Sequence, residues 1–247
     1  CISGVNDNVC FTPYQHIFGS TALQDAMQRE ISSGSDAGKR ISSLKSNGAN
    51  VHFALGSAGV ANNIGSDGTV GSGHMNNGRC YQIALNPQNT QGVKNHVIMQ
   101  SINTGLDNAF DLFIPAGGAG AFPDDGWGYC SATWGTNLYS GSTKLGDETV
   151  QKMPHLQDTD LCKKTSSNES TDSIRQKCKE FFSGVDNNVY SDRQDATDSF
   201  MESCVQSVKS RVGCPKESNN HINSSWQAIE CPLELTRVSG LQLQASP

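Results

Sequence analysis

The sequence predicts a β-rich fold built as one domain with an insertion. Only 17% of the 247 residues are charged and 25 are glycine, a composition that favours strands and turns over long helices. From residue 51 to residue 122, short apolar runs alternate with Gly, Asn and Ser. The length fits one domain with a substantial core. We therefore expect a single domain, residues 1–247, whose sheet lies mainly within 51–122.

The first predicted element is a small surface helix. Ser20 and Thr21 supply an N-cap, and an apolar stripe follows at helical spacing up to Ile31 before the helix ends at residues 32–34. The apolar runs that follow have the length and boundaries of buried or half-buried strands. These predicted strands are residues 81–85, 96–102 and 110–114.

The chain becomes polar and charged between about residues 139 and 198, and this stretch is predicted to be a helical insertion stapled by its own cysteines. Within it, Thr171 is the expected cap of a helix that ends before Gly184. A second helix is expected from residue 191 to about residue 208, followed by strand character at 226–231. Trp226 is expected to be a core residue.

Charge and cysteine usage exclude several classes of protein. The net charge of −6 is diffuse and no basic cluster occurs, so nucleic acid is not an expected partner. No apolar run approaches the ~20 residues needed to cross a bilayer, so no membrane association is expected. Nine dispersed cysteines without a CxxC pair, together with N-glycosylation sequons at Asn168 and Asn223, indicate disulfides and an extracellular, secreted protein. A signal peptide is absent from the first residues, so we expect it to have been removed or the chain to be trimmed.

Cofactor chemistry has no support in the sequence. The six histidines lack metal-ligand spacing, so no metal site is predicted. The glycines at 117, 118 and 120 lack the following helix and the Lys or acidic partner of a nucleotide-binding loop. No GxSxG motif is present, so a serine esterase is also unsupported. We therefore predict no cofactor.

Four segments in order along the chain resemble glycoside hydrolase family 45, of the expansin-like double-psi β-barrel superfamily. Residues 97–122 resemble the family's central signature, in which a QSTNTGGD-like strand end leads to HFDL, PGGG and GxF. Residues 53–56, 78–83 and 226–235 resemble its FALGF, CYEL and QVQCPAEL segments. The resemblance implies a six-stranded double-psi β-barrel with short helices, and a secreted, monomeric endo-β-1,4-glucanase that hydrolyses β-glucan with inversion.

The same resemblance implies a disulfide pattern. Cys80 would pair with Cys231, and Cys204 with Cys214. Cys130 would pair with a cysteine near the N-terminus, for which Cys10 is the choice. Cys162 and Cys178 would form the pair of the insertion, and Cys1 would be left over.

Inverting hydrolysis of a glycoside uses one carboxylic acid to protonate the leaving oxygen and a second carboxylate to activate water. The resemblance makes Asp111 the general acid, because it falls in the Phe-Asp-Leu segment. Partial desolvation between Phe110 and Leu112 would raise the pKa of this carboxyl. The alternative is an aspartate at a strand end that caps a turn. Asp107 resembles the family's assisting aspartate, although the loop is short here, and its alternative is a turn residue.

The general base is the least well matched residue. The family carries it in a TRYWD segment, and residues 12–16 are the nearest match, with His16 at the aspartate position. An imidazole has a suitable pKa for a base, but a structural histidine, Asp7 or an acid before Cys1 are alternatives. Tyr14 would stack on a sugar ring or else be a core tyrosine.

The sequence also leaves open the roles of two tryptophans and two alternative functions of the protein. Trp127 and Trp134 would extend the glycan-binding groove or else be buried loop residues. A non-hydrolytic, expansin-like glycan-binding protein on the same barrel is the alternative function. An extracellular scaffold protein that assembles through the insertion and Cys1 is the third.

Overall fold

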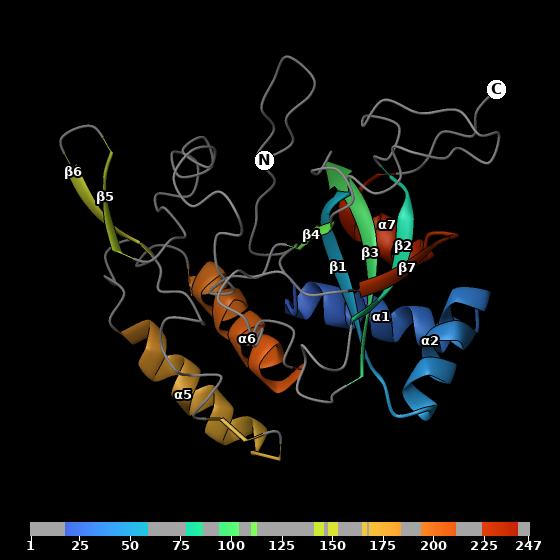
Figure 1. Cartoon of the computed structure of the whole chain (residues 1–247), viewed down its shortest axis with the longest axis horizontal. Helices are drawn as coiled ribbons and strands as arrows, with labels where there is room; N and C mark the ends of the chain where they lie inside the picture. Colours follow the sequence, from blue (N-terminus) through green and yellow to red (C-terminus); the bar gives the residue numbers. More distant parts are fainter. Residues whose placement is uncertain are drawn as a thin grey trace.

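The computed structural model consists of a mixed β-sheet, a separate hairpin and five helices in its described part (Figure 1). It describes residues 18–58, 78–85, 94–103, 110–112, 141–145, 148–152, 165–166, 168–183, 194–210 and 224–241. The helices are α1 (Thr21–Ser33), α2 (Asp36–Ser46), α5 (Thr171–Ser183), α6 (Gln194–Ser210) and α7 (Leu233–Ser239). The strands are β1 (Asn50–Ala58), β2 (Cys80–Leu85), β3 (Asn95–Asn103), β4 (Phe110–Leu112), β5 (Gly141–Leu145), β6 (Glu148–Lys152) and β7 (Ser224–Ile229).

Five strands form one sheet in the order β4-β1-β3-β2-β7. β1 and β3 are parallel, and every other neighbouring pair in this sheet is antiparallel. The register of β1 against β3 shifts between Gly56 and Ser57, so that Gly56 faces Ser101 and Ser57 faces Asn103. β5 and β6 pair only with each other among the described strands. The strands predicted at 81–85, 96–102 and 110–114 are thus confirmed, with shifts of a few residues at their ends.

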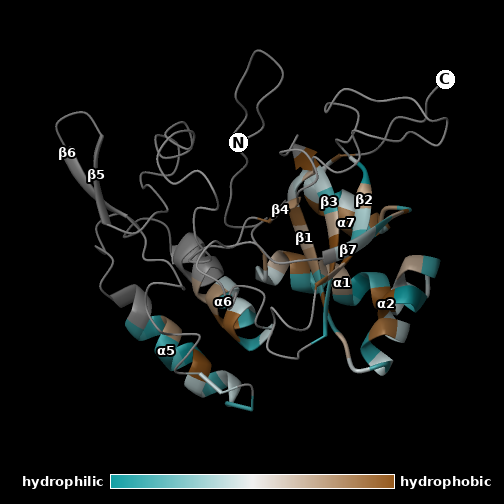
Figure 2. Ribbon diagram, viewed as in Figure 1, coloured by the Kyte–Doolittle hydropathy of each residue, from teal (hydrophilic) through white to brown (hydrophobic). Residues whose placement is uncertain are grey.

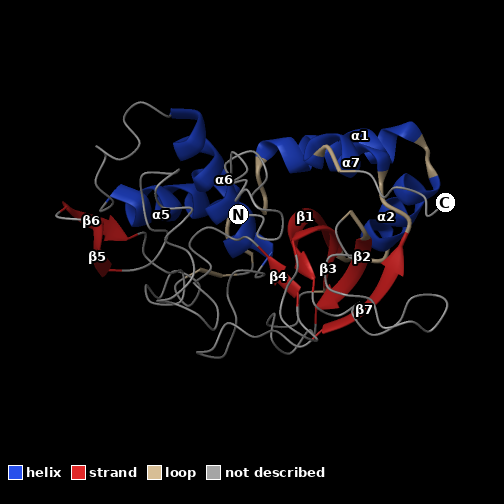
Figure 3. Cartoon of the chain, turned by 90° about the horizontal axis from the view of Figure 1, so that it is seen from above, coloured by secondary structure: helices blue, strands red, loops and turns tan. Residues whose placement is uncertain are grey.

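One face of the sheet is covered by α1, α2 and α7 (Figure 3). Alternate side chains of β1 pack under these helices, because successive side chains of a strand point to opposite faces. Leu23, Ile41 and Leu235, one from each helix, meet Val51 and Phe53 of β1 in this layer. Figure 2 shows polar and apolar residues on different sides of α2, one of these covering helices. This layer forms one of two buried hydrophobic clusters among the described residues, and the other includes Phe18, Tyr81 and Met99.

The other face of the sheet is concave, as three aromatic rings show. Phe110 and Trp226 stand on β4 and β7, the two edges of the sheet, yet their ring centroids are 5.7 Å apart. The ring centroid of Tyr81 on β2 lies 5.2 Å from that of Phe110 and 5.7 Å from that of Trp226. In a flat sheet, four strand spacings would separate the edges by about 19 Å. The sheet is therefore strongly curled, and its two edges approach each other.

Trp226 is more exposed than the sequence predicted, since a core residue was expected at this position. Its side chain contacts the buried Tyr81, but the residue keeps 43% of its surface exposed. The physical reason is its position on β7, which pairs on one side with β2 and has no second partner strand in the described part of the chain. Trp226 is thus a residue at the rim of the concave face.

Two helices in the covering layer were not predicted. The helix predicted after Ser20 is confirmed as α1, whose cap is the Ser20 hydroxyl and whose end is Gly34 in the left-handed conformation, at φ 69°. α2 follows after two residues, Gly34 and Ser35, and α7 begins at Leu233, after the closing strand β7 has ended at Ile229. The N-terminus of α7 is capped by a residue that is distant in the sequence. The buried Glu30 carboxylate of α1 accepts the Glu234 backbone N–H at 2.8 Å.

The cysteine pairing is partly confirmed and partly wrong. Cys80 and Cys231 are bonded as predicted. Cys204, however, is bonded to Cys178, which excludes the predicted pairs of Cys204 with Cys214 and of Cys178 with Cys162. The bond joins α5 to α6, so the insertion is stapled to the following helix rather than to itself. The predictions for Cys1, Cys10 and Cys130 lie outside the described residues.

The insertion differs from its prediction in two further details. It contains the β5–β6 hairpin as well as α5. The helix predicted from residue 191 to about residue 208 is confirmed as α6, which begins at Gln194 and ends at Ser210. Ser170, not Thr171, caps α5, because its hydroxyl accepts the Ser173 backbone N–H at 3.2 Å. Besides the disulfide, an ion pair of 2.8 Å between Arg175 and Glu202 holds α5 against α6.

Candidate active site

Asp111 lies in the middle of β4, at the end of the sheet where β1 and β3 finish. The register places Asp111 opposite Ser57 of β1, and Ser57 opposite Asn103 of β3. The three backbones therefore form one row across three strands. β1 ends at Ala58 and β3 ends at Asn103, so both strands finish beside this row, and Asp107 follows β3 in the sequence. The sheet thus fixes the backbone of Asp111 at the end of β1 and β3.

Asp111 is the only aspartate, glutamate, lysine or arginine in the five described strands of the curled sheet. Isolated charged residues are rarely kept in the middle of a sheet, because removing a charge from water is costly unless it is paired or used. Asp111 is the predicted general acid, and both that role and the alternative of a turn cap stay predictions.

The other predicted site residues cannot be placed. Asp107, His16 and Tyr14 lie outside the described residues, as do Trp127 and Trp134. The backbone of Asp111 is described, and its side chain is outside that description. The structure accordingly neither joins nor separates the proposed acid, assisting residue and base.

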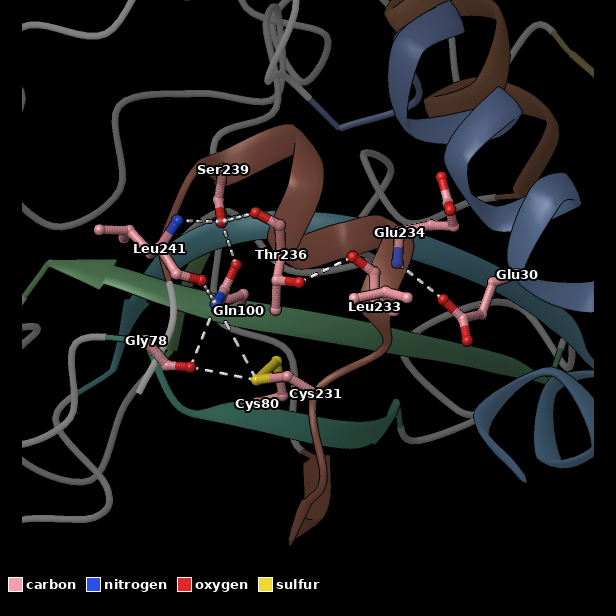
Figure 4. Close-up of a disulfide and its surroundings, with 10 residues drawn as sticks. All are labelled: Glu30, Gly78, Cys80, Gln100, Cys231, Leu233, Glu234, Thr236, Ser239 and Leu241. Carbon is pink, nitrogen blue, oxygen red and sulfur yellow. Dashed lines mark hydrogen bonds between the residues drawn. A yellow bond between two sulfur atoms is a disulfide. The ribbon is translucent and has the colours of Figure 1, made fainter. Parts of the chain in front are cut away.

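A buried carboxamide network, which the sequence did not reveal, surrounds Gln100 of β3, three residues before Asn103 (Figure 4). Gln100 of β3 is fully buried, and its Nε2 donates to Gly78 O at 3.1 Å and to Leu241 O at 3.0 Å. Its Oε1 accepts the Ser239 hydroxyl. The Cys80–Cys231 disulfide lies against the same amide, with Cys231 Sγ 3.9 Å from Nε2. The only signal of this network in the sequence is Gln100 itself, at a strand position where the alternation of side chains predicts an apolar residue.

Burial disfavours the charged forms of three titratable side chains of the sheet. Burial, reinforced by the Lys45 charge, lowers the pKa of His52 to about 4. Burial also lowers the pKa of His96, and it raises the pKa of Tyr81 against the opposing effect of Arg79. These directions are those of a poorly hydrated interior that disfavours charge.

The described residues contain neither a cluster of metal-ligating side chains nor a helix that could cross a membrane. No group of three or more His, Cys, Asp or Glu side chains that could hold a metal ion occurs among the described residues. Over the same ranges, no helix has the length and apolar character required to cross a membrane.

Comparison with known proteins identifies the family. The model of the family described as glycosyl hydrolase family 45 matches residues 56–216, more than half of the chain. A similar solved structure is the cellulase from the Antarctic springtail, Cryptopygus antarcticus, at 20% sequence identity and a TM-score of 0.40. The match covers 77% of this chain and 64% of the cellulase, so the chain spans less than two thirds of that protein's length. Among curated proteins, none matches the sequence.

The family match and the geometry coincide at one place in the molecule. The matched residues begin within β1 and include β2, β3 and β4, and therefore the whole row of Ser57, Asn103 and Asp111. They also include both cysteines of the bond between α5 and α6. The chain belongs to glycosyl hydrolase family 45.

Proposed function

We propose that this protein is a secreted, monomeric endo-β-1,4-glucanase that hydrolyses β-glucan with inversion. The observation that carries the proposal is Asp111, the one acidic residue in the described strands of the sheet, at the end of β1 and β3 and within the family match. A match to a hydrolase family does not favour the alternative of a non-hydrolytic glycan-binding protein.

In the proposed mechanism, Asp111 protonates the oxygen of the leaving sugar while a second group activates water on the opposite side of the ring. In inverting enzymes the two carboxyl groups are about 6.5–9.5 Å apart, which leaves room for that water. We assign the base to His16 and an assisting role to Asp107. Tyr14, Trp127 and Trp134 would bind the sugar rings, since aromatic faces stack on the apolar faces of pyranoses.

The proposed barrel is a six-stranded double-psi β-barrel that forms one domain over residues 1–247, with the insertion at about 139–198. It is supported by the curl of the sheet, because Phe110 and Trp226 meet although they belong to opposite edges. A sixth strand between β4 and β7 would close the barrel and remove both exposed edges.

Secretion is supported by the disulfides Cys80–Cys231 and Cys178–Cys204, which persist in oxidising compartments. Asn168, the first residue of a sequon, is exposed just before α5 and would be accessible to a glycan. An intact mass of the secreted protein before and after removal of N-glycans tests this modification.

The activity is tested by the release of reducing ends from carboxymethyl cellulose and mixed-linkage β-glucan. Asp111→Asn removes the proton donor and should lower activity by at least ~100-fold, the typical contribution of a positioned acid. Asp25→Asn is the matched control, because Asp25 is exposed on α1 in the helical layer. A folded Asp111→Asn variant with wild-type activity would refute the assignment of the acid. A folded wild type that binds glucan without cleaving it would refute the hydrolase.

A further inference from the structure

We propose that Gln100 is a positioning residue that holds the end of β3, and through it the strand that carries Asp111. This inference rests on the proposed function. Gln100 is fully buried, so it cannot touch a polysaccharide. Any effect on hydrolysis must therefore act through the backbone that it holds.

The side chain of Gln100 joins three segments that are far apart in the sequence. Its two N–H groups are both used, one on Gly78 O just before β2 and one on Leu241 O just after α7. Its oxygen accepts the Ser239 hydroxyl at the end of α7, and the same hydroxyl oxygen accepts the Leu241 backbone N–H at 3.0 Å. Because both donors and the acceptor are satisfied, the carboxamide has one preferred orientation.

The backbone around Gln100 is fixed at the same place. Ser101 N donates to Arg79 O at 2.8 Å, and Gly78 N donates to Ser101 O at 2.7 Å. The Cys80–Cys231 bond anchors this end of β2 to the segment between β7 and α7. The network thus ties the end of β3 to β2 and to the C-terminal helix (Figure 4).

The row that contains Asp111 begins three residues beyond Gln100. Asn103 of β3 faces Ser57 of β1, which faces Asp111 of β4, and the register shift between Gly56 and Ser57 lies between this row and Gln100. Neighbouring strands are about 4.8 Å apart, so a displaced β3 end moves the row that supports the acid. A misplacement of ~1 Å at a catalytic group can cost ~100-fold in rate.

The chain offers a matched control at the other end of the same strand. Asn95 is also a buried carboxamide, and its Nδ2 donates to Ser210 O of α6 at 2.7 Å. It lies five residues from Gln100, which is about 17 Å along a strand. Gln100→Met and Asn95→Leu both replace an amide by an apolar group of similar size, so both test the loss of a buried network. Only the first lies beside the Asp111 row.

The test compares kcat, KM and thermal unfolding of wild type, Gln100→Met and Asn95→Leu on soluble β-glucan, well below the unfolding temperature. We expect both variants to unfold at lower temperature. We expect kcat to fall at least about tenfold in Gln100→Met with KM changed less than about twofold, the pattern of a lost transition-state arrangement. Asn95→Leu should keep the wild-type kcat.

A folded Gln100→Met variant with wild-type kcat would overturn the inference, and so would an equal loss of kcat in Asn95→Leu. If Gln100→Met does not fold, Ser239→Ala decides, because it removes the hydroxyl that Gln100 accepts and leaves the glutamine in place. A lower kcat in Ser239→Ala supports the inference, and an unchanged kcat overturns it. Absence of hydrolysis by the wild type refutes the proposed function instead, and the positioning role with it.

Discussion

Removal of either of the two disulfides in the described part of the chain should destabilise the protein to a different and calculable extent. Cys80 and Cys231 are 151 residues apart in the sequence, whereas Cys178 and Cys204 are 26 residues apart. In the chain-entropy model, a disulfide stabilises mainly by restricting the unfolded chain, and the effect grows with the logarithm of the loop length. The long loop then contributes about 5 kcal/mol and the short loop about 3.5 kcal/mol at 25 °C.

The two loops are nested, which changes the estimate very little. The bond between residues 178 and 204 shortens the loop between 80 and 231 by about 25 residues, and this lowers the larger value by only about 0.2 kcal/mol. The expected order is therefore unaffected: Cys80→Ala with Cys231→Ala is the more destabilising double substitution. Alanine is the suitable replacement, because a serine hydroxyl at the buried positions 80, 178 and 204 would lack a partner.

Denaturant unfolding of both double variants and wild type, under non-reducing conditions at 25 °C, gives the two free-energy differences. A peptide map of the non-reduced wild type checks the pairing in the same preparation. A greater loss of stability without the Cys178–Cys204 bond would contradict the loop calculation. A peptide that links Cys204 to Cys214 would contradict the connection between α5 and α6.

Two other substitutions probe the sheet. His52 has a pKa lowered to about 4 in the folded state. The unfolded state therefore binds more protons between pH 6.5 and pH 4, and the protein loses stability as the pH is lowered through that window. We expect this group to make the protein about 2 kcal/mol less stable at pH 5 than at pH 7. Urea unfolding at both pH values should show a smaller difference in stability for His52→Phe. An equally large difference in that variant would contradict the assignment. Trp226→Ala should cost about 1–3 kcal/mol by removing ring contacts to Tyr81 and Phe110. Leu233, the other exposed large apolar residue among those that the structure describes, is the control, and an equal loss in Leu233→Ala would contradict the role of the ring cluster.

The strands and the main helices could be predicted because their signals are local. Periodicity and boundaries identify β2, β3 and α1 from a few neighbouring residues, and the Ser20 cap is encoded beside the helix it starts. The Cys80–Cys231 pair came from a family resemblance that extends over much of the chain. Such motifs can be recognised in the sequence because each one lies within a short segment.

The missed elements depend on contacts between distant residues. α2 buries little besides Gly38 and Ile41, and Gly38 is required because a Cβ there would lie 2.2 Å from Glu30 O of α1. α7 has no side-chain cap of its own, and its N-terminal N–H group is accepted by Glu30, about two hundred residues earlier. Neither relationship produces a local pattern.

The same reason explains the errors in the cysteine pairs and the missed glutamine. Spacing cannot choose among the many pairings of nine cysteines, and Cys178 meets Cys204 only because α5 and α6 pack side by side. Gln100 gains its partners from three separate segments. Asp111 was identified by its motif, and its isolation among uncharged strand residues became visible only once the sheet was assembled.

The most direct test of the central claim is the configuration of the first sugar released. A time course of ¹H NMR spectra, recorded while the protein cleaves a soluble β-1,4-linked glucan oligosaccharide, distinguishes the anomers before they equilibrate. Inversion at a β-linkage predicts that the α-anomer appears first and then converts slowly to the mixture. Initial appearance of the β-anomer would contradict the inverting mechanism, and absence of any product from the folded protein would contradict the hydrolase itself.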